Sequence, residues 1–149
     1  MITVKDILNK KGHDYWYVSP ENSILEALQL MAIKNIGALM VIENGKLVGM
    51  FSERDFARKA INQDFCIKGT KVLDLMTTEI FVVSPETTLN ECMALMTQRK
   101  VRHLPVIDRN KIVGIISIGD VVNSIIHQQN ITIKNLQDYI LGSGYGSEV

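Results

Sequence analysis

The sequence predicts a mixed α/β (α+β) fold in which two copies of a β-α-β-β-α unit pack against each other, followed by a short C-terminal helix. The main observation is internal repetition, because residues 18–55 align without a gap with residues 83–120, at a constant offset of 65 (83 minus 18). Each copy also carries a helix-start motif and two short apolar runs separated by a turn sequence. An ordered self-match of this length indicates a duplicated unit.

The first helix of each copy is predicted from a capping box. The sequences SILE and TLNE place helix starts at Ile24 and Leu89. In such a box the hydroxyl accepts a backbone N–H bond and the Glu reaches back to the cap residue. Apolar residues then recur at positions i, i+3, i+4 and i+7 in both copies, as expected for a helix with one buried face.

Two strands and a second helix follow in each copy. The apolar runs 38–42 and 46–51 flank Asn44-Gly45, which suits a type I′ hairpin because both residues tolerate a positive φ. The second copy has the sequence DRN at the same place. The second helix is expected to open at Ser52 and at Ser117. A single three-stranded unit buries too little surface to be stable, so the two copies are expected to share their packing.

The repeat borders divide the chain into four parts. Residues 1–66 form the first repeat with its N-terminal segment, which includes an irregular entry loop at 12–17, and residues 67–130 form the second repeat. Residues 131–142 are predicted to form a short amphipathic helix, whose apolar stripe needs either this core or a second subunit as a partner. Residues 143–149 are expected to be a disordered tail.

Composition argues against several classes of function. Sixteen basic and sixteen acidic residues give a formal net charge of zero, which makes nucleic-acid binding unlikely. The N-terminus has no apolar signal region and no window reaches the length of a membrane span, so we expect a soluble cytoplasmic protein without membrane contact. No phosphate-binding loop, nucleophile elbow, metal pattern or dinucleotide fingerprint occurs, so we expect neither an enzyme nor a metal site.

The repeats resemble the CBS (cystathionine-β-synthase) domain, and the pair resembles a stand-alone Bateman module. The resemblance rests on the segment VSPE with the helix that follows it, on the strand pair HLPVIDRNKIVGIIS and on the motif Gly-x-x-Ser-x-x-Asp that closes each repeat. It extends from Thr3 to about Ile126. It implies two repeats related by pseudo-two-fold symmetry, and it implies a homodimer of CBS pairs.

The resemblance also implies a regulatory ligand. Modules of this kind bind adenosine-containing small molecules between the repeats, so we expect AMP or NAD(H) first, with ATP, ADP and S-adenosylmethionine as further possibilities. The ligand would be a signal rather than a catalytic cofactor, and an unidentified downstream protein would respond to it. The alternative is a ligand-free scaffold or dimerisation module with decayed pockets.

The Ser and Asp of the closing motif suit both helix capping and ligand binding. Ser52 and Ser117 are expected to cap helices, but a helix N-terminus with free N–H groups also binds phosphate. An Asp can accept two hydrogen bonds from vicinal ribose hydroxyls. By resemblance, Asp55 and Asp120 would be the ribose ligands.

The resemblance places the base of each ligand against the opposite repeat. For the Asp120 cleft we expect a base pocket made of Trp16, Tyr17, Ile36, Gly37, Ala38 and Ile115, in which the small pair leaves room for a flat base. For the Asp55 cleft we expect base contacts from Met50, Phe81 and Val101, with Arg102 and His103 binding phosphate.

Three of these assignments have a second interpretation. Arg54 and Arg58 share one helix face and form either a phosphate clamp or ordinary surface charge. His103 either binds phosphate or is a hydrogen-bonded, partly buried histidine. Trp16 either stacks on the base, packs the entry loop or makes a dimer contact.

Overall fold

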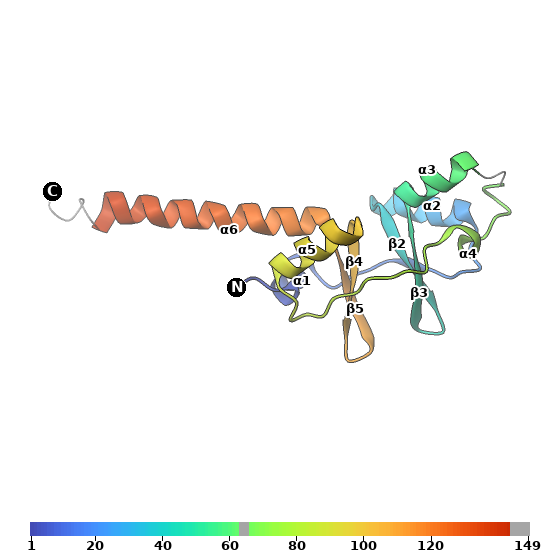
Figure 1. The fold of residues 1–149 in the computed structure, drawn as a ribbon, viewed down its shortest axis with the longest axis horizontal. Coiled ribbons are helices and arrows are strands. Elements are labelled where there is room, and N and C mark those ends of the chain that lie inside the picture. Colours follow the sequence, from blue (N-terminus) through green and yellow to red (C-terminus); the bar gives the residue numbers. More distant parts are fainter. Residues whose placement is uncertain (63–65, 144–149) are drawn as a thin grey trace.

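The structure is a computed structural model that describes residues 1–62 and 66–143. A body built from two β-hairpins and their helices carries one long helix that projects from it (Figure 1). The elements in chain order are α1 (Val4–Lys11), β1 (Tyr17–Val18), α2 (Ile24–Lys34), β2 (Ala38–Glu43), β3 (Lys46–Ser52), α3 (Glu53–Asn62), α4 (Val72–Leu75), α5 (Leu89–Arg99), β4 (His103–Asp108), β5 (Lys111–Ser117), α6 (Ile118–Asp138) and a π-helical turn (Tyr139–Ser143).

The predicted duplication is confirmed in the local structure. Helices α2 and α5 begin at Ile24 and Leu89, each with its capping box formed. Strands β2 and β3 pair antiparallel, as do β4 and β5, and both hairpins shift register at the same place. The turn residues Asn44 and Gly45 have φ values of 52° and 78°, so both central positions are left-handed, as the type I′ turn requires.

The first strand differs between the two copies. In the first copy β1 pairs parallel with β2 and gives a three-stranded sheet. In the second copy the equivalent pairing is reduced to a bridge between Val83 and Val106, so that sheet has two strands. Helices α1 and α4 were not predicted, and each precedes the first strand position of its repeat.

Each of the two unpredicted helices packs into the core of the other repeat. Val4, Ile7 and Leu8 of α1 are buried in the core of the second repeat. Val72 and Leu75 of α4 are buried in the core of the first. Dividing the chain at residue 66 therefore assigns α4 to the second repeat, although α4 completes the core of the first. The two repeats are held together by these exchanged helices as well as by the contacts between their facing surfaces.

The repeated glycine of the closing motif is explained by these crossings. A Cβ atom on Gly49 would lie 2.7 Å from Met76 Sδ and 3.0 Å from the Thr77 carbonyl oxygen, in the segment that follows α4. A Cβ atom on Gly114 would lie 2.8 Å from Cδ2 of Leu8, in α1. A side chain at Gly49 would press on the Thr77 carbonyl oxygen, which is backbone, whereas at Gly114 it would press only on the flexible Leu8 side chain, so the need for glycine is stricter at Gly49.

The C-terminal helix differs from the prediction. The prediction of a separate helix at 131–142 is wrong about where the helix begins. Helix α6 continues without a break from Ile118 to Asp138, and the π-helical turn follows it directly. The reason is local, since no proline interrupts α6 and its only glycine, Gly119, lies in the first turn. Of the tail predicted to be disordered, residues 144–149 lie outside the described residues.

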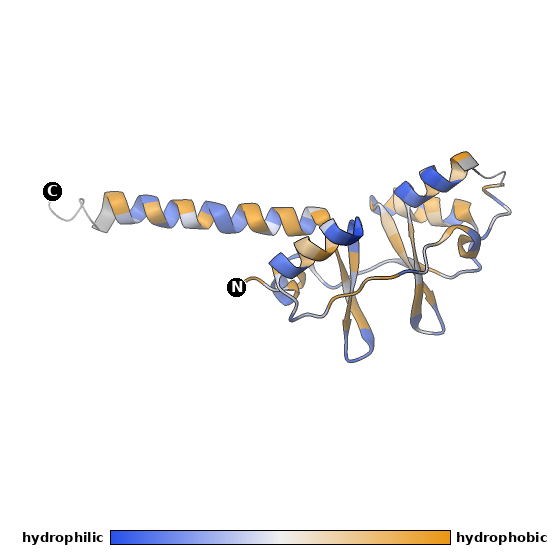
Figure 2. Ribbon diagram, in the orientation of Figure 1, coloured by the Kyte–Doolittle hydropathy of each residue, from blue (hydrophilic) through white to orange (hydrophobic). Residues whose placement is uncertain are grey.

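Apolar and polar residues separate as this packing requires. Figure 2 shows hydrophobic residues along the strands and hydrophilic residues at the hairpin tips, while α6 carries both in alternating bands. In the described part of the chain, no helix is both long and apolar enough to cross a membrane.

Candidate functional site

Two cavities lie between the repeats, and each contains the Asp of one closing motif. The Asp55 cavity has a volume of about 210 Å³ and the Asp120 cavity about 380 Å³. Gly37, Ala38 and His103 line both, so the cavities are neighbours that share a wall. These three residues separate the two cavities, and the other lining residues belong to one cavity only.

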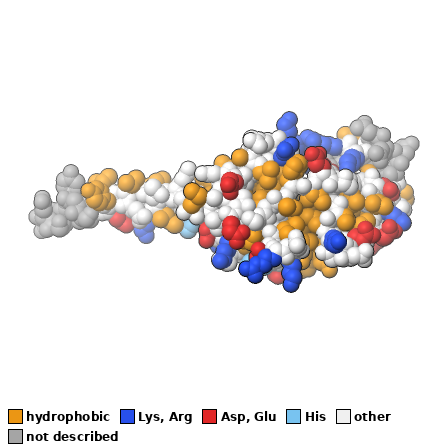
Figure 3. Space-filling model, turned by 60° about the horizontal axis from the view of Figure 1, so that its bottom comes forward, with side chains coloured by type: hydrophobic (Ala, Val, Ile, Leu, Met, Phe, Trp, Pro, Cys, Tyr) orange, Lys and Arg blue, Asp and Glu red, His pale blue; other side chains and the backbone are white. Residues whose placement is uncertain are grey.

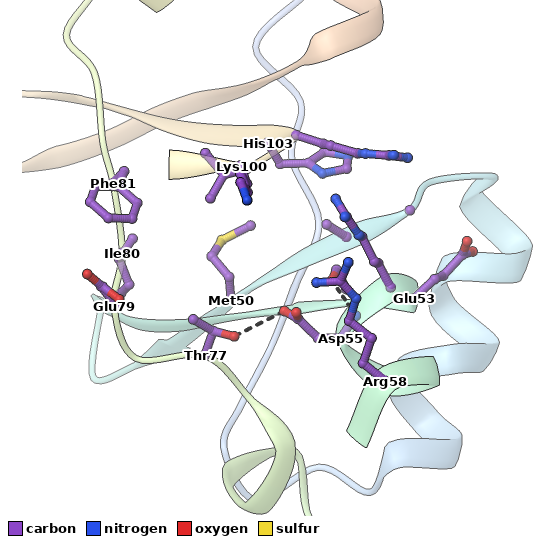
Figure 4. A pocket seen from close by; sticks show the side chains of 16 residues that line it. Met50, Glu53, Asp55, Arg58, Thr77, Glu79, Ile80, Phe81, Lys100 and His103 are labelled. Carbon is purple, nitrogen blue, oxygen red and sulfur yellow. Dashed lines mark hydrogen bonds between the residues drawn. The ribbon is translucent and has the colours of Figure 1, made fainter. Parts of the chain in front are cut away.

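The Asp55 cavity contains every residue that the sequence predicted for it. These are Met50, Ser52, Arg54, Asp55, Arg58, Phe81, Val101, Arg102 and His103. They come from β3, the start of α3, the segment before β4 and the segment after α4. Figure 4 shows Asp55, Arg58, Thr77, Lys100 and His103 arranged around the opening. The structure brings these residues together, whereas their binding roles remain predictions.

Asp55 is held in place by two hydrogen bonds. The backbone N–H of Asp55 donates to Ser52 Oγ over 3.0 Å, which is the predicted helix cap. Thr77 Oγ1 donates to Asp55 Oδ2 over 3.0 Å (Figure 4). Thr77 is itself fixed by reciprocal backbone bonds with Met50, of 2.9 and 2.8 Å. The carboxylate of Asp55 is thus oriented by the hydroxyl of Thr77.

Four cations line the same cavity as this carboxylate. They are Arg54, Arg58, Lys100 and Arg102, and within residues 1–62 and 66–143 none of their side chains forms an ion pair or a hydrogen bond. Such a group of unpaired cations at a helix N-terminus attracts anions, above all phosphates. Neighbouring Lys59 does not belong to this group, because its Nζ donates to the carbonyl oxygen of Leu75 over 2.6 Å.

His103 is neutral at pH 7 in this environment. Burial lowers the pKa of its imidazole below the ordinary value of 6.5, and the charges of Lys11 and Arg102 lower it further, while Asp120 opposes them. The side chain stands against Gly37, where a Cβ atom would lie 3.7 Å from its Cε1. His103 therefore presents a neutral imidazole to both cavities rather than a fixed positive charge.

The Asp120 cavity contains an ion pair that the sequence did not reveal. Lys11 Nζ donates to Asp120 Oδ2 over 2.8 Å and to the carbonyl oxygen of Ile115 over 2.9 Å. Burial acts to raise the pKa of the Asp120 carboxyl, but the hydrogen bonds from Lys11 and from the backbone of Ser117 outweigh it, so the pKa lies below its usual range. This carboxylate is already compensated, unlike that of Asp55.

Most of the base pocket predicted for Asp120 is assembled. Its members are Trp16, Ile36, Gly37, Ala38 and Ile115, with Ser117 beside them. Tyr17 is not among the lining residues, because it lies in β1 with 55% of its surface exposed. Trp16 lines the cavity and also contacts Lys34, whose Nζ lies 3.9 Å from the ring centroid. One ring face of Trp16 is therefore already occupied by a cation.

Several lining residues were missed by the sequence analysis. They are Lys11, Asp14 and Asn35 in the Asp120 cavity, and Glu53, Thr77, Glu79, Ile80 and Lys100 in the Asp55 cavity. Thr77, Glu79 and Ile80 fall in the segment between the repeats, outside the gap-free alignment. Lys100 was within reach of prediction, because it directly precedes Val101 and Arg102.

Among residues 1–62 and 66–143, no group of three or more His, Cys, Asp or Glu side chains could hold a metal ion. Burial, with a contribution from Glu91, raises the pKa of the Cys92 thiol to about 11, so this sulfur is protonated at neutral pH.

Comparisons with known proteins agree with this architecture. Residues 4–62 and 72–127 each match the CBS domain, so the chain belongs to the CBS domain family, whose members are regulatory, nucleotide-sensing modules. The mitochondrial CBS domain-containing protein CBSX3 of Arabidopsis thaliana is 37% identical over 96% of this chain and 73% of its own length.

Two solved structures extend the comparison. The crystal structure of the CBS domain NE2398 is 45% identical, covers 83% of this chain and 97% of that chain, and superimposes with a TM-score of 0.80. The crystal structure of CBSX2 in complex with AMP is 28% identical, covers 85% of this chain and 98% of that chain, and has a TM-score of 0.71.

Proposed function

We propose that the chain is a non-catalytic sensor that binds an adenine nucleotide, AMP or NAD(H), in the cleft between its repeats. The observation that carries the proposal is the Asp55 cavity, where an oriented carboxylate stands among unpaired cations. A carboxylate can accept two hydrogen bonds from the vicinal hydroxyls of a ribose, and the cations suit the phosphate attached to it. The presence of both groups in one cavity favours a nucleotide over a bare phosphate or a sugar.

The comparison with CBSX2 supports AMP as the first ligand to test. CBSX2 shares the fold and holds AMP. NAD(H), ADP, ATP and S-adenosylmethionine carry the same adenosine group and differ in charge and size, so they test how the cations of the Asp55 cavity respond to the phosphate portion.

The two cavities are expected to differ in affinity. A ribose entering the Asp120 cavity has to share Asp120 with Lys11, whereas in the Asp55 cavity only the hydroxyl of Thr77 is in place. We therefore expect nucleotide to fill the Asp55 cavity first. The Lys11–Asp120 pair is also the observation that favours the second candidate function, a ligand-free scaffold or dimerisation module, because it shows one motif Asp already engaged within the protein.

Signalling would follow from the position of the ligand between the repeats. A nucleotide that contacts both can favour one mutual orientation, to the extent that it binds that orientation more tightly. A downstream protein would then distinguish the two states, and a homodimer of CBS pairs would present two copies of the signal.

Thermal unfolding with AMP, ADP, ATP, NAD, NADH and S-adenosylmethionine tests the proposal. A ligand at 100 times its dissociation constant adds about 2.7 kcal/mol to the free energy of unfolding. We expect Asp55→Asn to abolish the shift, Asp120→Asn to reduce it less, and Asp108→Asn, a carboxylate outside both cavities, to leave it unchanged. No shift with any of the six ligands would overturn the sensor and leave the scaffold.

A further inference from the structure

The distal part of α6 extends away from the body (Figure 1). From Ile126 to Asp138 every residue of the helix is exposed to solvent. Between Ile126 and Leu141 the sequence contains four Ile, two Asn and one Thr, which are weaker helix formers than Ala or Leu, and an isolated helix of this length is marginal in water. A helix of this composition needs contacts along one side to be stable.

An apolar stripe with coiled-coil spacing runs along α6. Its positions are separated alternately by four and three residues, and we name them the α6 seam: Val122, Ile126, Gln129, Ile133, Leu136 and Ile140. Ile126 and Ile133 then occupy heptad positions a, and Gln129 and Leu136 occupy positions d. Figure 3 shows hydrophobic side chains continuing from the body along the projecting helix.

The α6 seam is turned away from the body's own core. Where α6 leaves the body, Val121 is 1% exposed and packs into the second core, together with the partly buried Ile125. The neighbouring positions around the helix, Val122 and Ile126, are 44% and 49% exposed. A second helix can therefore reach the seam without displacing the contacts that fix α6 to the body.

Charge and side-chain shape indicate which kind of helix binds to the α6 seam. Between Val121 and Leu141 the formally charged residues are Lys134 and Asp138, and neither lies in the seam or beside it. A partner helix of strong charge would find no complement here, whereas two copies of α6 would meet without repulsion. Ile at a with Leu at d favours a parallel pair of strands. We propose that α6 forms a parallel, in-register two-stranded coiled coil with α6 of a second copy of this chain.

Gln129 supports the parallel register. In a parallel pair each seam residue faces its own equivalent, so the two Gln129 amides can hydrogen-bond to each other. In an antiparallel pair an a position faces a d position, and the amide would be buried against isoleucine without a partner. A seam of about three heptads is short for a coiled coil, so we expect a dimer that dissociates on dilution.

Sedimentation over a range of protein concentrations tests the seam with a matched pair of variants. Ile133 and Ile131 are 53% and 47% exposed on the same helix, but only Ile133 lies in the seam. We expect Ile133→Asp to be monomeric with reduced helical circular dichroism, and Ile131→Asp to dimerise like the wild type. A monomeric wild type, or two variants that behave alike, would overturn the proposal.

Cross-linking tests the orientation. In a Cys66→Ser background, which removes the exposed native thiol, we expect oxidised Leu136→Cys to give a covalent dimer and Gln128→Cys, on the outer face, to remain monomeric. A dimer that Leu136→Cys fails to cross-link would overturn the parallel register. No nucleotide is used in either experiment, so their outcome is independent of the proposed sensor function.

Discussion

Lys11 Nζ lies 2.8 Å from Asp120 Oδ2, and this pair joins the end of α1 to the start of α6 across 109 residues of sequence. The corresponding Asp55 accepts instead from the neutral hydroxyl of Thr77. Two copies of one sequence motif therefore present carboxylates in different electrostatic states. The difference arises from the exchanged segments that cross each cleft rather than from the motif itself.

Replacing Lys11 by Met is expected to raise the pKa of the Asp120 carboxyl towards or above its ordinary value of 3.8, because burial then acts without the opposing hydrogen bond. A carboxyl-carbon titration followed by NMR measures this shift. A Lys10→Met control, which leaves the pair intact, is expected to leave the pKa unchanged, and an unchanged pKa in Lys11→Met would contradict the pairing.

The same pair predicts how stability depends on pH. Since the folded pKa of Asp120 lies below 3.8, its contribution is present above the unfolded pKa and is lost as the pH falls through the folded value. For a partly exposed pair we expect a contribution of about 1 kcal/mol at neutral pH. Urea unfolding at neutral and acid pH should show a smaller acid-induced loss in Lys11→Met than in the wild type.

His103 is expected to make phosphate binding depend on pH. The apo imidazole is neutral at pH 7 because its pKa lies below 6.5, and a phosphate beside it would raise that pKa. AMP affinity should therefore increase several-fold as the pH falls from about 8 to about 6, with proton uptake visible by calorimetry in buffers of different ionisation enthalpy. His103→Gln should remove this dependence, and His127→Gln on exposed α6 should keep it.

Without ligand, acidification is expected to have an unfavourable effect, because it should lower the free energy of unfolding. A histidine whose folded pKa is lowered stabilises the fold above the unfolded pKa, near 6.5, and that contribution is lost as the pH falls through this value. The free energy of unfolding without ligand should decrease on acidification in the wild type and less so in His103→Gln. A wild type that gains stability between pH 7 and about pH 5.5 would contradict a buried neutral His103.

The repeated glycines predict a graded loss of stability. Gly49→Ala places a methyl group against Met76 Sδ and the Thr77 carbonyl, and backbone cannot move aside, so we expect a loss of about 1–3 kcal/mol. Gly114→Ala meets only the Leu8 side chain, and its loss should be smaller. Gly69→Ala is the control, because its nearest neighbour lies 3.8 Å away and the change should be within about 0.5 kcal/mol. Chemical denaturation of the three variants gives the order.

Arg58 is expected to recognise phosphate rather than base. Arg58→Gln removes a cation that is unpaired within the described residues, so binding of ATP, ADP and AMP should weaken about tenfold or more while adenosine binding changes little. Isothermal titration with each ligand separates these effects. Arg109→Gln, in the β4–β5 turn, is the matched control, and an equal loss for adenosine and AMP would contradict a phosphate contact.

The sequence predicted what depends on local pattern. Capping boxes located the starts of α2 and α5, and the positive φ of Asn44 and Gly45 followed from the turn sequence. The resemblance to the CBS domain also placed Gly37 and Ile115 in one pocket with Asp120, and all three line one cavity. These features are determined by residues close together in the chain or by the symmetry of a duplication.

The features that the sequence analysis did not predict depend on contacts between residues far apart in the chain, which a local sequence pattern does not indicate. The apolar side of α1 is buried only because the helix packs into the second core, and Lys11 meets Asp120 only because of that crossing. Thr77 lies outside the aligned residues, so repetition could not point to it. The continuity of α6 was missed because the end of the repeat was taken as the end of a helix, although no stop signal stands there.

The exchange of α1 and α4 has a consequence for the order in which the chain acquires structure during synthesis. The first core draws on a continuous stretch from Val18 to Leu75, so it is complete while the second repeat is still being translated. Helix α1 leaves the ribosome before either core, but the surface that buries Leu8 includes Ile116 and Val121. At a synthesis rate of roughly 5–20 residues per second, α1 therefore remains without its core for several seconds, until Ile116 and Val121 have been synthesised.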